Sequence, residues 1–400
     1  MTVWDDLVGQ ERVSEQLIAA ARDGDAQVTS GEAPAGSRMT HAWLFTGPPG
    51  SGRSTAARAF AAALQCVSPD RALESGVPGC GFCDGCHTTM VGTHADITIL
   101  TTELLSIGVK ETRELVRSAG LAPAVGRWQV IVVEDADRLT EGAANVLLKA
   151  IEEPAPRTVW LLCAPSLEDV LPTIRSRCRH LTLRTPPIDA VADILVRRDG
   201  IEPAAAAAAA RAAQGHIGRA RRLATDERAR TRRATVLKLP LAVDDIGGCL
   251  RGAQELVDAA AEAAKEQAEE VDAQETEDLR TALGAAPGGA GRMPRGTAGA
   301  MKELQDKQKR RSTRTQRDSL DLALIDLAGF YRDVLALQLG SGGALSNDDM
   351  RDALDRLASS SPPEATLRRI EAVLACREAL DRNVAPLLAV ESMTMALRAG

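Results

Sequence analysis

The residues with the clearest capacity for chemistry lie in a glycine-rich loop, Gly-Pro-Pro-Gly-Ser-Gly-Arg-Ser at 47–54. A short apolar run precedes the loop, and the composition of Thr55–Leu64 predicts a helix directly after it. In such a strand–loop–helix unit, backbone N–H groups and the positive end of the helix dipole surround a phosphate group. The residues expected to form this cradle are Gly47, Gly50, Gly52, Arg53 and Ser54.

The loop departs from the usual phosphate-binding pattern at one position. The pattern G-x-x-x-x-G-K-[ST] has lysine where this chain has Arg53. Lysine is a compact point charge that fits between two phosphates, whereas arginine is a bulky planar fork. Ser54 keeps the hydroxyl group that would contact magnesium. The sequence therefore predicts the shape of a nucleotide cradle but leaves open whether ATP and magnesium bind, the alternative being a glycine–proline turn without a ligand.

Four cysteines follow the predicted helix, with a C-x-x-C-x-x-C run and one cysteine upstream of it: Cys66, Cys80, Cys83 and Cys86. Four thiolates are the number that tetrahedral zinc requires, and the glycines between them allow the chain to fold back around an ion. An iron–sulfur cluster is the main competing interpretation, and a redox pair would not use all four sulfurs. We expect structural zinc, because a closed all-thiolate site leaves no open position for chemistry.

An acidic pair, Glu134-Asp135, follows a β-branched run at 130–133 that is typical of a strand buried on both faces of a parallel sheet. Carboxylates at the carboxyl end of such a strand lie where α/β sheets bind ligands. ATPases carry aspartate and then glutamate there, for the magnesium shell and the attacking water. The order is inverted in this chain, and the shorter second carboxylate would not reach the water well. A strand end with two solvated acids explains the pair equally well.

Composition limits the class of protein. The 400 residues carry a net charge of −7, which argues against a strongly basic nucleic-acid binder but allows local basic patches. No signal peptide and no apolar run of spanning length is apparent, so we expect a cytoplasmic protein without a membrane segment.

The elements that must position these residues change character along the chain. We expect a flexible connection at Asp23–Arg38 and a short helix at Ser166–Thr173, and beyond residue 184 the patterns predict helices only. Segment 262–317 has acidic and basic ends around Gly284–Gly299, whose composition predicts disorder. The two ends are expected to form either a helical hairpin or two solvated arms. The arginine-rich stretch at 219–233 is either a solvated helix face or a contact for DNA phosphates or acidic partners.

The order of these motifs resembles that of bacterial DNA polymerase III clamp-loader subunits of the AAA+ superfamily. The motifs that carry the resemblance are the phosphate loop, the four cysteines, Thr93-His94-Ala95-Asp96, Glu134-Asp135-Ala136-Asp137, Asn145-Val146-Leu147-Leu148-Lys149 with Glu152-Glu153-Pro154, and Ser176-Arg177-Cys178. The resemblance covers residues 3–225 closely, and the rest only in its helical character. Within the family the chain is more similar to the delta-prime subunits than to the motor subunits of the gamma/tau type.

The resemblance implies a fold and a set of roles. It implies an α/β P-loop (AAA+) parallel-sheet domain at 1–183 with the zinc module at 66–86, an all-α lid at 184–238 and an all-α collar at 239–400 that carries the 262–317 insertion. By the same resemblance the four cysteines hold zinc. Arg177 is the arginine finger that reaches in trans to ATP on a neighbouring motor subunit, whereas from the residues alone it is equally a solvated or salt-bridged arginine.

Four departures from the motor pattern imply that the chain hydrolyses no ATP itself. They are Arg53, the inverted Glu134-Asp135, the apolar Cys163-Ala164-Pro165 at the first sensor, and Gly218 where the second sensor has arginine. The implied function is that of a rigid stator in ATP-dependent loading of the sliding clamp onto primed DNA. The implied partners are motor (gamma/tau-like) and delta-like subunits in a hetero-oligomer, the clamp and primer-template DNA. The alternatives are an active motor subunit and a scaffold without a role in trans.

Overall fold

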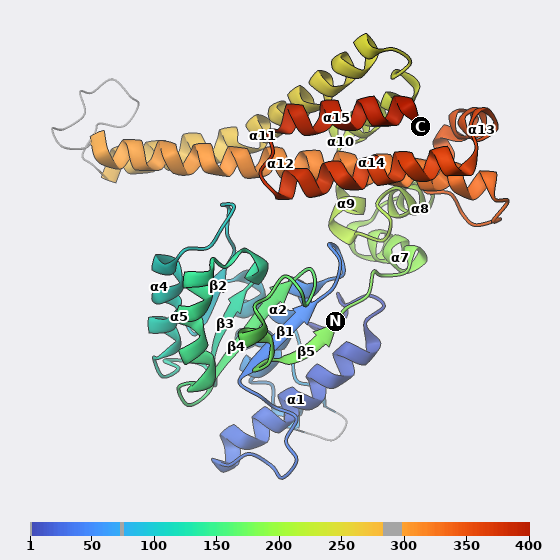
Figure 1. The fold of residues 1–400 in the computed structure, drawn as a ribbon. Coiled ribbons are helices and arrows are strands. Elements are labelled where there is room, and N and C mark those ends of the chain that lie inside the picture. Colours follow the sequence, from blue (N-terminus) through green and yellow to red (C-terminus); the bar gives the residue numbers. More distant parts are fainter. Residues whose placement is uncertain (1, 73–75, 283–297) are drawn as a thin grey trace. The chain divides into compact units, whose positions relative to one another are not determined.

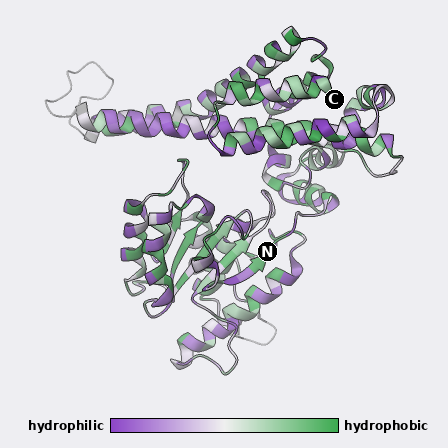
Figure 2. Ribbon diagram, in the orientation of Figure 1, coloured by the Kyte–Doolittle hydropathy of each residue, from purple (hydrophilic) through white to green (hydrophobic). Residues whose placement is uncertain are grey.

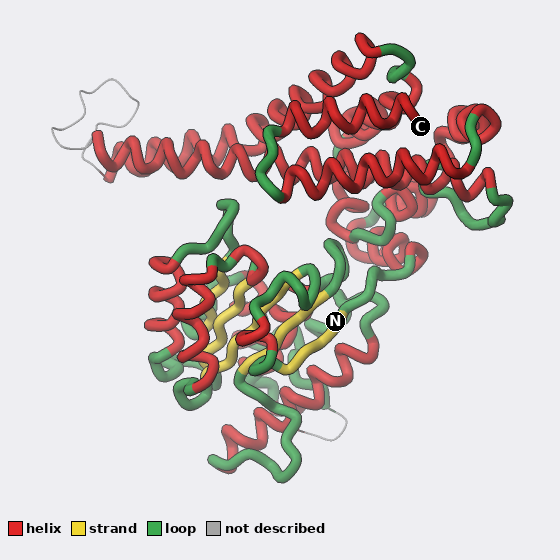
Figure 3. Tube along the Cα trace, in the orientation of Figure 1, coloured by secondary structure: helices red, strands yellow, loops and turns green. Residues whose placement is uncertain are grey.

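In a computed structural model, the protein is described over residues 2–72, 76–282 and 298–400. The chain forms two compact units, Met1–Thr102 with Ser106–Arg221, and Glu103–Leu105 with Arg222–Gly400. In the described residues, strands occur only in the first unit, and the second is built of helices and loops (Figures 1 and 3).

The first unit contains a five-stranded parallel sheet in the order β2-β3-β4-β1-β5. The strands are β1 (Ala42–Thr46), β2 (Ile97–Leu100), β3 (Gln129–Val133), β4 (Thr158–Ala164) and β5 (Arg179–Thr182). The three central strands are buried along their whole length, as continuous apolar runs predict for a parallel sheet covered on both faces.

Successive side chains of each strand enter two different cores, because the side-chain period of a strand is two. Trp43 and Phe45 pack with Phe60 on one face, where the rings of Trp43 and Phe60 meet edge to face at 5.1 Å between centroids. Leu44 and Trp160 belong to the core on the other face. The sheet is thus fixed between two helical layers, and the loops at its carboxyl edge start from rigid strand ends.

The helices of the first unit are α1 (Glu11–Ser30), α2 (Arg53–Gln65), α3 (Asp84–Val91), α4 (Val109–Ala119), α5 (Glu141–Glu152), α6 (Pro172–Arg175), α7 (Ile188–Asp199) and α8 (Pro203–Ala212), with 3₁₀ turns η1 (Pro69–Ala72) and η2 (Ala136–Arg138). Helix α9 (Ile217–Thr225) runs across the boundary into the second unit. The second unit contains α10 (Glu227–Lys238), η3 (Leu239–Leu241), α11 (Ile246–Ala282), α12 (Ala298–Gln338), η4 (Asp348–Met350), α13 (Arg351–Ser360), α14 (Pro363–Asp381) and α15 (Pro386–Ala399). None of the described helices combines the length and the low charge that a membrane crossing requires.

The acidic and basic ends of segment 262–317 form a helical hairpin rather than solvated arms. They lie on the long helices α11 and α12, which pack against each other and are largely hydrophilic toward their far ends (Figure 2). Arg311 on α12 is buried and contacts Asp272 and, at 2.7 Å, Glu275 on α11. This guanidinium group lowers the pKa of Glu275 to about 2.

The disorder predicted for Gly284–Gly299 falls, except for its last two residues, outside the described part of the chain.

Two predictions about local structure are wrong. The connection predicted at Asp23–Arg38 is helical as far as Ser30. Asp25 holds this part of the helix against the protein, because it is buried and forms an ion pair with Arg71 at 3.0 Å. Most of Ser166–Thr173 is not helical, and α6 begins only at Pro172.

The arginine-rich stretch at 219–233 is largely bonded within the protein. Arg232 lies 3.1 Å from Glu266, and Arg230 donates to the carbonyl of Leu223 at 3.0 Å. The side chain of Arg233 is 10% exposed, and its Nε lies 3.1 Å from the buried Asp326. These contacts favour a structural role for the stretch over a DNA contact.

The Arg233–Asp326 pair allows a test of the second unit. Asp326→Ala leaves a buried cation without its main partner, and we expect the free energy of unfolding to fall by about 3–5 kcal/mol. Asp349 lies 3.9 Å from the same Arg233 but its side chain is 69% exposed. Asp349→Ala should therefore change the free energy of unfolding by less than about 1 kcal/mol. Urea denaturation followed by circular dichroism measures both. Equal effects of the two substitutions would contradict this assignment.

Candidate functional site

The glycine-rich loop leaves β1 at the carboxyl edge of the sheet and enters α2, as the sequence predicts. Gly50 and Gly52 have φ values of 83° and 92°, which side chains other than glycine rarely adopt. Gly52 caps the N-terminus of α2, and the N–H of Gly47 donates to the carbonyl of Pro165 at 3.1 Å. The loop therefore has the strand–loop–helix geometry that can hold a phosphate group.

The side chain of Arg53 turns back onto the loop. Its Nη1 donates to the carbonyl of Gly47 at 2.8 Å. A phosphate-loop lysine would instead extend toward the phosphates of a nucleotide. In this chain the cation is bonded to the backbone of its own loop.

His216 packs directly on the loop. A Cβ atom added at Gly50 would lie only 2.4 Å from Cγ of His216, so the imidazole ring covers this glycine closely. Burial lowers the pKa of His216, and the neighbouring Arg219 and Arg53 lower it further, so the ring is neutral at pH 7. The sequence showed only that glycine replaces the sensor arginine at Gly218, and had no signal for this contact.

The acidic pair lies at the end of β3, two strands away from the loop. Strand β4 separates β3 from β1, with Val133 beside Leu162 and Phe45 beside Cys163. Cys163 is buried between the two sites, and burial and the nearby Glu134 raise its pKa. The carboxyl edge thus brings the loop and the acidic pair to opposite sides of one buried strand end.

Both carboxylates of the pair are bonded within the chain. Glu134 Oε1 lies 2.8 Å from Nε of Arg58 on α2, and Glu134 Oε2 accepts from the hydroxyl of Thr101 at 3.2 Å. Asp135 Oδ1 lies 3.9 Å from Nε of Arg138. The role of Arg58 was not predicted, because nothing in the spacing of α2 distinguishes it from a surface arginine.

Arg177 differs from the two arginines that flank it. Arg175 donates to the carbonyl of Leu167 at 3.3 Å, and Arg179 lies over the ring of Trp43 at 5.0 Å from its centroid. Arg177 follows α6 on an exposed turn. Its Nη1 donates to the carbonyl of Thr173 at 2.8 Å, and its Nη2 lies 2.5 Å from Oε1 of Glu152. The two side chains are 39% and 44% exposed, so the pair is open to solvent.

The four predicted cysteines come together. The Sγ atoms of Cys66, Cys80, Cys83 and Cys86 all lie within 4.8 Å of one another, although Cys66 ends α2 and Cys86 lies in α3. Cys66 and Cys86 are buried, and Cys80 and Cys83 are half-buried. The N–H of Cys83 donates to Sγ of Cys80 at 3.4 Å, as in knuckles whose thiolates bind a metal. The donor set fits a divalent soft-ligand ion such as zinc, and it leaves no position for a substrate.

The thiols of this cluster lie close enough to affect one another's ionisation, with Sγ of Cys83 3.9 Å from Sγ of Cys66. The neighbouring Cys86 lowers the pKa of Cys66, and the same interaction together with burial raises the pKa of Cys86. One thiolate is therefore stabilised by the others even before an ion is considered.

Asp96, at the end of the Thr93–Asp96 motif, has a structural role. Its carboxylate accepts from the N–H groups of Ala124 at 2.6 Å, of Val125 at 2.9 Å and of Gly126. Burial opposes ionisation, but these three donors lower the pKa of Asp96. The motif therefore holds the loop that leads into β3.

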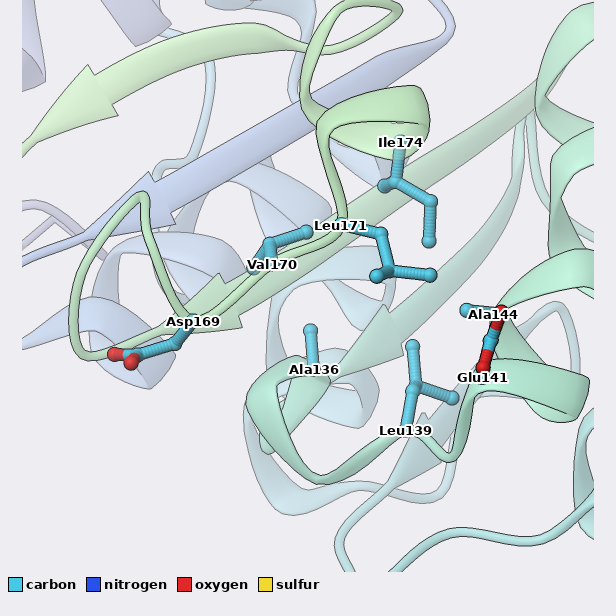
Figure 4. Close-up of a pocket in the computed structure, with 8 residues that line it drawn as sticks. All are labelled: Ala136, Leu139, Glu141, Ala144, Asp169, Val170, Leu171 and Ile174. Carbon is cyan, nitrogen blue, oxygen red and sulfur yellow. The ribbon is translucent and has the colours of Figure 1, made fainter.

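A small cavity of about 140 Å³ lies on the α5 side of the sheet. Figure 4 shows side chains from η2, the start of α5 and the segment that includes α6 around it, with the carboxylate of Asp169 turned away. The residues that line it are Ala136, Leu139, Glu141, Ala144, Asp169, Val170, Leu171 and Ile174. Its size is well below the several hundred Å³ of small-molecule sites, and its lining is mainly apolar. We do not regard it as a nucleotide site.

The fold and the loop define the class of protein. A parallel sheet in the order β2-β3-β4-β1-β5, with a phosphate loop between β1 and α2 and helices following the sheet, is a P-loop module of the AAA+ type.

Comparison with known proteins gives the family. Residues 31–187 match the family described as DNA polymerase III, delta subunit, and residues 316–395 match DNA polymerase III, delta subunit, C terminal. Together these ranges make up more than half of the chain. The chain belongs to the DNA polymerase III clamp-loader family.

Curated relatives include both types of subunit. The DNA polymerase III subunit delta' of Pseudomonas aeruginosa is 36% identical over 42% of this chain and 50% of its own length. The delta' of Escherichia coli is 35% identical over 46% of this chain and 54% of its own length. The gamma/tau subunit of Mycobacterium tuberculosis is 33% identical over 48% of this chain and 30% of its own length. The matched part thus spans about half or less of these relatives, and the two types are matched at similar identity.

Solved structures are more distant. A RuvB mutant of Thermotoga maritima has a TM-score of 0.37 at 19% identity and covers 58% of this chain and 65% of its own. A DNA polymerase III gamma subunit-related protein of the same organism has a TM-score of 0.34 at 16% identity, with 89% and 93% covered. At these scores the likeness adds nothing to the assignment.

The cysteine cluster leads to a prediction about metal. We expect the purified chain to contain one zinc ion, and Cys80→Ser to lose it and to unfold at a lower temperature, because the metal ties α2 to α3. Cys178→Ser, a half-buried cysteine outside the cluster, is the control and should keep the metal. Elemental analysis and thermal melts measure both properties. Iron in place of zinc, with the absorption of a cluster, would favour the iron–sulfur interpretation.

Proposed function

We propose that this chain is a delta-prime-like subunit of a DNA polymerase III clamp loader that turns over no ATP and supplies Arg177 to ATP on a neighbouring motor subunit. The proposal depends mainly on one observation. Two groups that would face a nucleotide at the loop are bonded to the chain itself, Arg53 to Gly47 and Glu134 to Arg58. The ring of His216 also packs closely on Gly50. The subunit would then act as a rigid stator while its neighbours move.

The contrast among the arginines supports the role of Arg177. A trans-acting arginine has to reach outward, and its side chain has to exchange its own partners for phosphate oxygens. Arg179 lies over the buried ring of Trp43. Arg177 is bonded to the carbonyl of Thr173 within its own turn and to the solvent-exposed Glu152. An exposed pair of this kind contributes little stability, on the order of 0–1 kcal/mol, so the exchange costs little.

The proposed partners follow from the family. They are motor subunits of the gamma/tau type, a delta-like subunit, the sliding clamp and primer-template DNA, in a cytoplasmic hetero-oligomer. Zinc, when bound to the four cysteines, would hold the end of α2 against α3 and take no part in the reaction. The second unit would be the collar through which the subunits assemble.

An active motor subunit of the gamma/tau type is the alternative, and the 33% identity to such a subunit over 48% of the chain favours it. It predicts that the isolated chain binds and hydrolyses ATP.

ATP turnover by the isolated chain separates the two functions. We expect no phosphate release above background, and we expect Arg53→Lys alone not to restore it, because Arg58 still binds Glu134 and His216 still covers Gly50. A phosphate-release assay with magnesium, and a titration with fluorescent ATP, measure turnover and binding. A purified gamma/tau subunit serves as the positive control. Turnover by the unaltered chain at a comparable rate would establish the motor alternative.

Arg177 is tested in the reconstituted complex. A finger is worth about 10³–10⁵ in rate at the site that it serves, so Arg177→Ala should abolish that site's share of DNA-stimulated ATPase and slow clamp loading. Arg177→Lys should restore little, because lysine lacks the planar fork. The control is Arg113→Ala, an exposed arginine on α4. Unchanged ATPase with Arg177→Ala in a fully assembled complex would leave only the scaffold role.

A further inference from the structure

The cysteine knuckle exposes an aromatic side chain in a protein that buries its other aromatic residues. The chain has four tryptophans, four phenylalanines and one tyrosine, all within the described residues. Eight of these nine are buried, and Phe82 alone is exposed, at 76%. Phe82 is therefore the exception among the aromatic residues of this chain, and it lies in the knuckle.

The knuckle holds this side chain in a fixed place. Phe82 lies between Cys80 and Cys83, and the backbone N–H of Cys83 donates to Sγ of Cys80 across it. Helix α3 begins at Asp84, immediately after the knuckle. Because the backbone on both sides of Phe82 is ordered in advance, little conformational entropy is lost when the ring becomes buried in a partner.

Phe82 has an apolar neighbour and takes no part in the core beneath it. Cys80 and Cys83 pack against the core on the α2 side of the sheet, whereas Phe82 does not. The N–H of Val67 donates to Sγ of Cys83 at 3.5 Å, which places Val67, 52% exposed, at the same knuckle. We call Val67 and Phe82 the knuckle tip.

The knuckle tip lies at the end of the sheet opposite the phosphate loop. Helix α2 starts at the carboxyl edge with Arg53 and ends at Gln65, next to Cys66, and β2 starts at Ile97 shortly after the knuckle. The surface is therefore separate from the nucleotide cradle, which lies at the carboxyl end of β1. The turn that carries Arg177 directly precedes β5 and lies at the amino edge, but β5 is the outermost strand on the side of β1 that is away from β2.

The charge around the knuckle tip indicates the chemistry of its partner. Asp84 directly follows the knuckle and Asp70 lies three residues after Val67, and both are exposed. Four thiolates around a divalent ion would add a net negative charge. The nearby Arg71 does not offset this charge, because its Nε is bonded to Asp25. Nucleic acid would be repelled here, although an aromatic ring can stack on bases.

We propose that the knuckle tip is a docking site for a protein partner whose surface offers an apolar pocket for Phe82 bordered by lysine or arginine side chains. This rests on the proposed function, because the partner is sought among the proteins of the same assembly. An aromatic ring inserted into such a pocket is a typical interface hot spot.

The test compares Phe82→Ser and Phe82→Trp with the unaltered full-length, zinc-loaded chain. Affinities are measured by biolayer interferometry for the purified gamma/tau-type subunit, delta-type subunit and sliding clamp of the same organism. We expect Phe82→Ser to weaken binding to one of these proteins at least tenfold and Phe82→Trp to restore most of it. The interaction should weaken with salt. Val125→Ser is the matched control, because Val125 is 82% exposed on a loop before β3 and lies outside the knuckle.

The outcomes separate the two proposals. Zinc content and thermal melts equal to those of the unaltered chain show that Phe82→Ser leaves the fold intact. If the complex assembles and no affinity changes with Phe82→Ser, the docking site is wrong and the proposed function stands. If no subunit binds the unaltered chain, the proposed function is wrong, and the docking site that rests on it is wrong as well. An effect of Phe82→Ser confined to a single-stranded oligonucleotide, or to self-association measured by light scattering, would also overturn the protein-docking proposal.

Discussion

Charges gathered at the carboxyl edge of a parallel sheet must be compensated, and in this chain the compensation comes from the protein itself. The strands that end at this edge are buried on both faces, so a charge left there without a partner would cost desolvation free energy. Arg58 compensates Glu134, and the carbonyl of Gly47 accepts from Arg53. In a nucleotide-hydrolysing relative, magnesium and phosphate would complete the same balance. A ligand at this edge would have to replace contacts that already exist.

The energetics differ on the side of the module that carries Arg177. Glu152 and Arg177 are both well exposed, and an exposed ion pair can be given up at small cost. The two arginines, Arg58 and Arg177, are exposed to almost the same extent, but the side chain of Glu134 is 12% exposed and that of Glu152 is 44% exposed. The carboxylate beside Arg58 is therefore more shielded from solvent than the carboxylate beside Arg177. This asymmetry follows from burial and does not require the loop to lose its shape.

Much of this arrangement could be predicted from the sequence. What could not be predicted is which side chains contact each other across the fold. Glycine spacing predicted the loop, β-branched runs predicted the buried strands, and cysteine spacing predicted the cluster, because each depends on local geometry. The contacts Arg58–Glu134 and His216–Gly50 join segments far apart in the chain, and no local pattern encodes them. The helix predicted at Ser166–Thr173 failed because its apolar residues, Leu167 among them, serve the core in an irregular segment.

Helix α2 connects the features of this module physically. It begins at Arg53, carries Arg58 within its length, and is followed by Cys66 of the cysteine cluster. From Ala59 to Gln65 every residue of the helix is buried, and it contacts α1, α3 and three strands, so it cannot shift without disturbing the core. A metal bound at its far end would restrain it further. Arg53 and Arg58 are then held toward the carboxyl edge by the same buried helix that leads into the cysteine knuckle at the opposite edge.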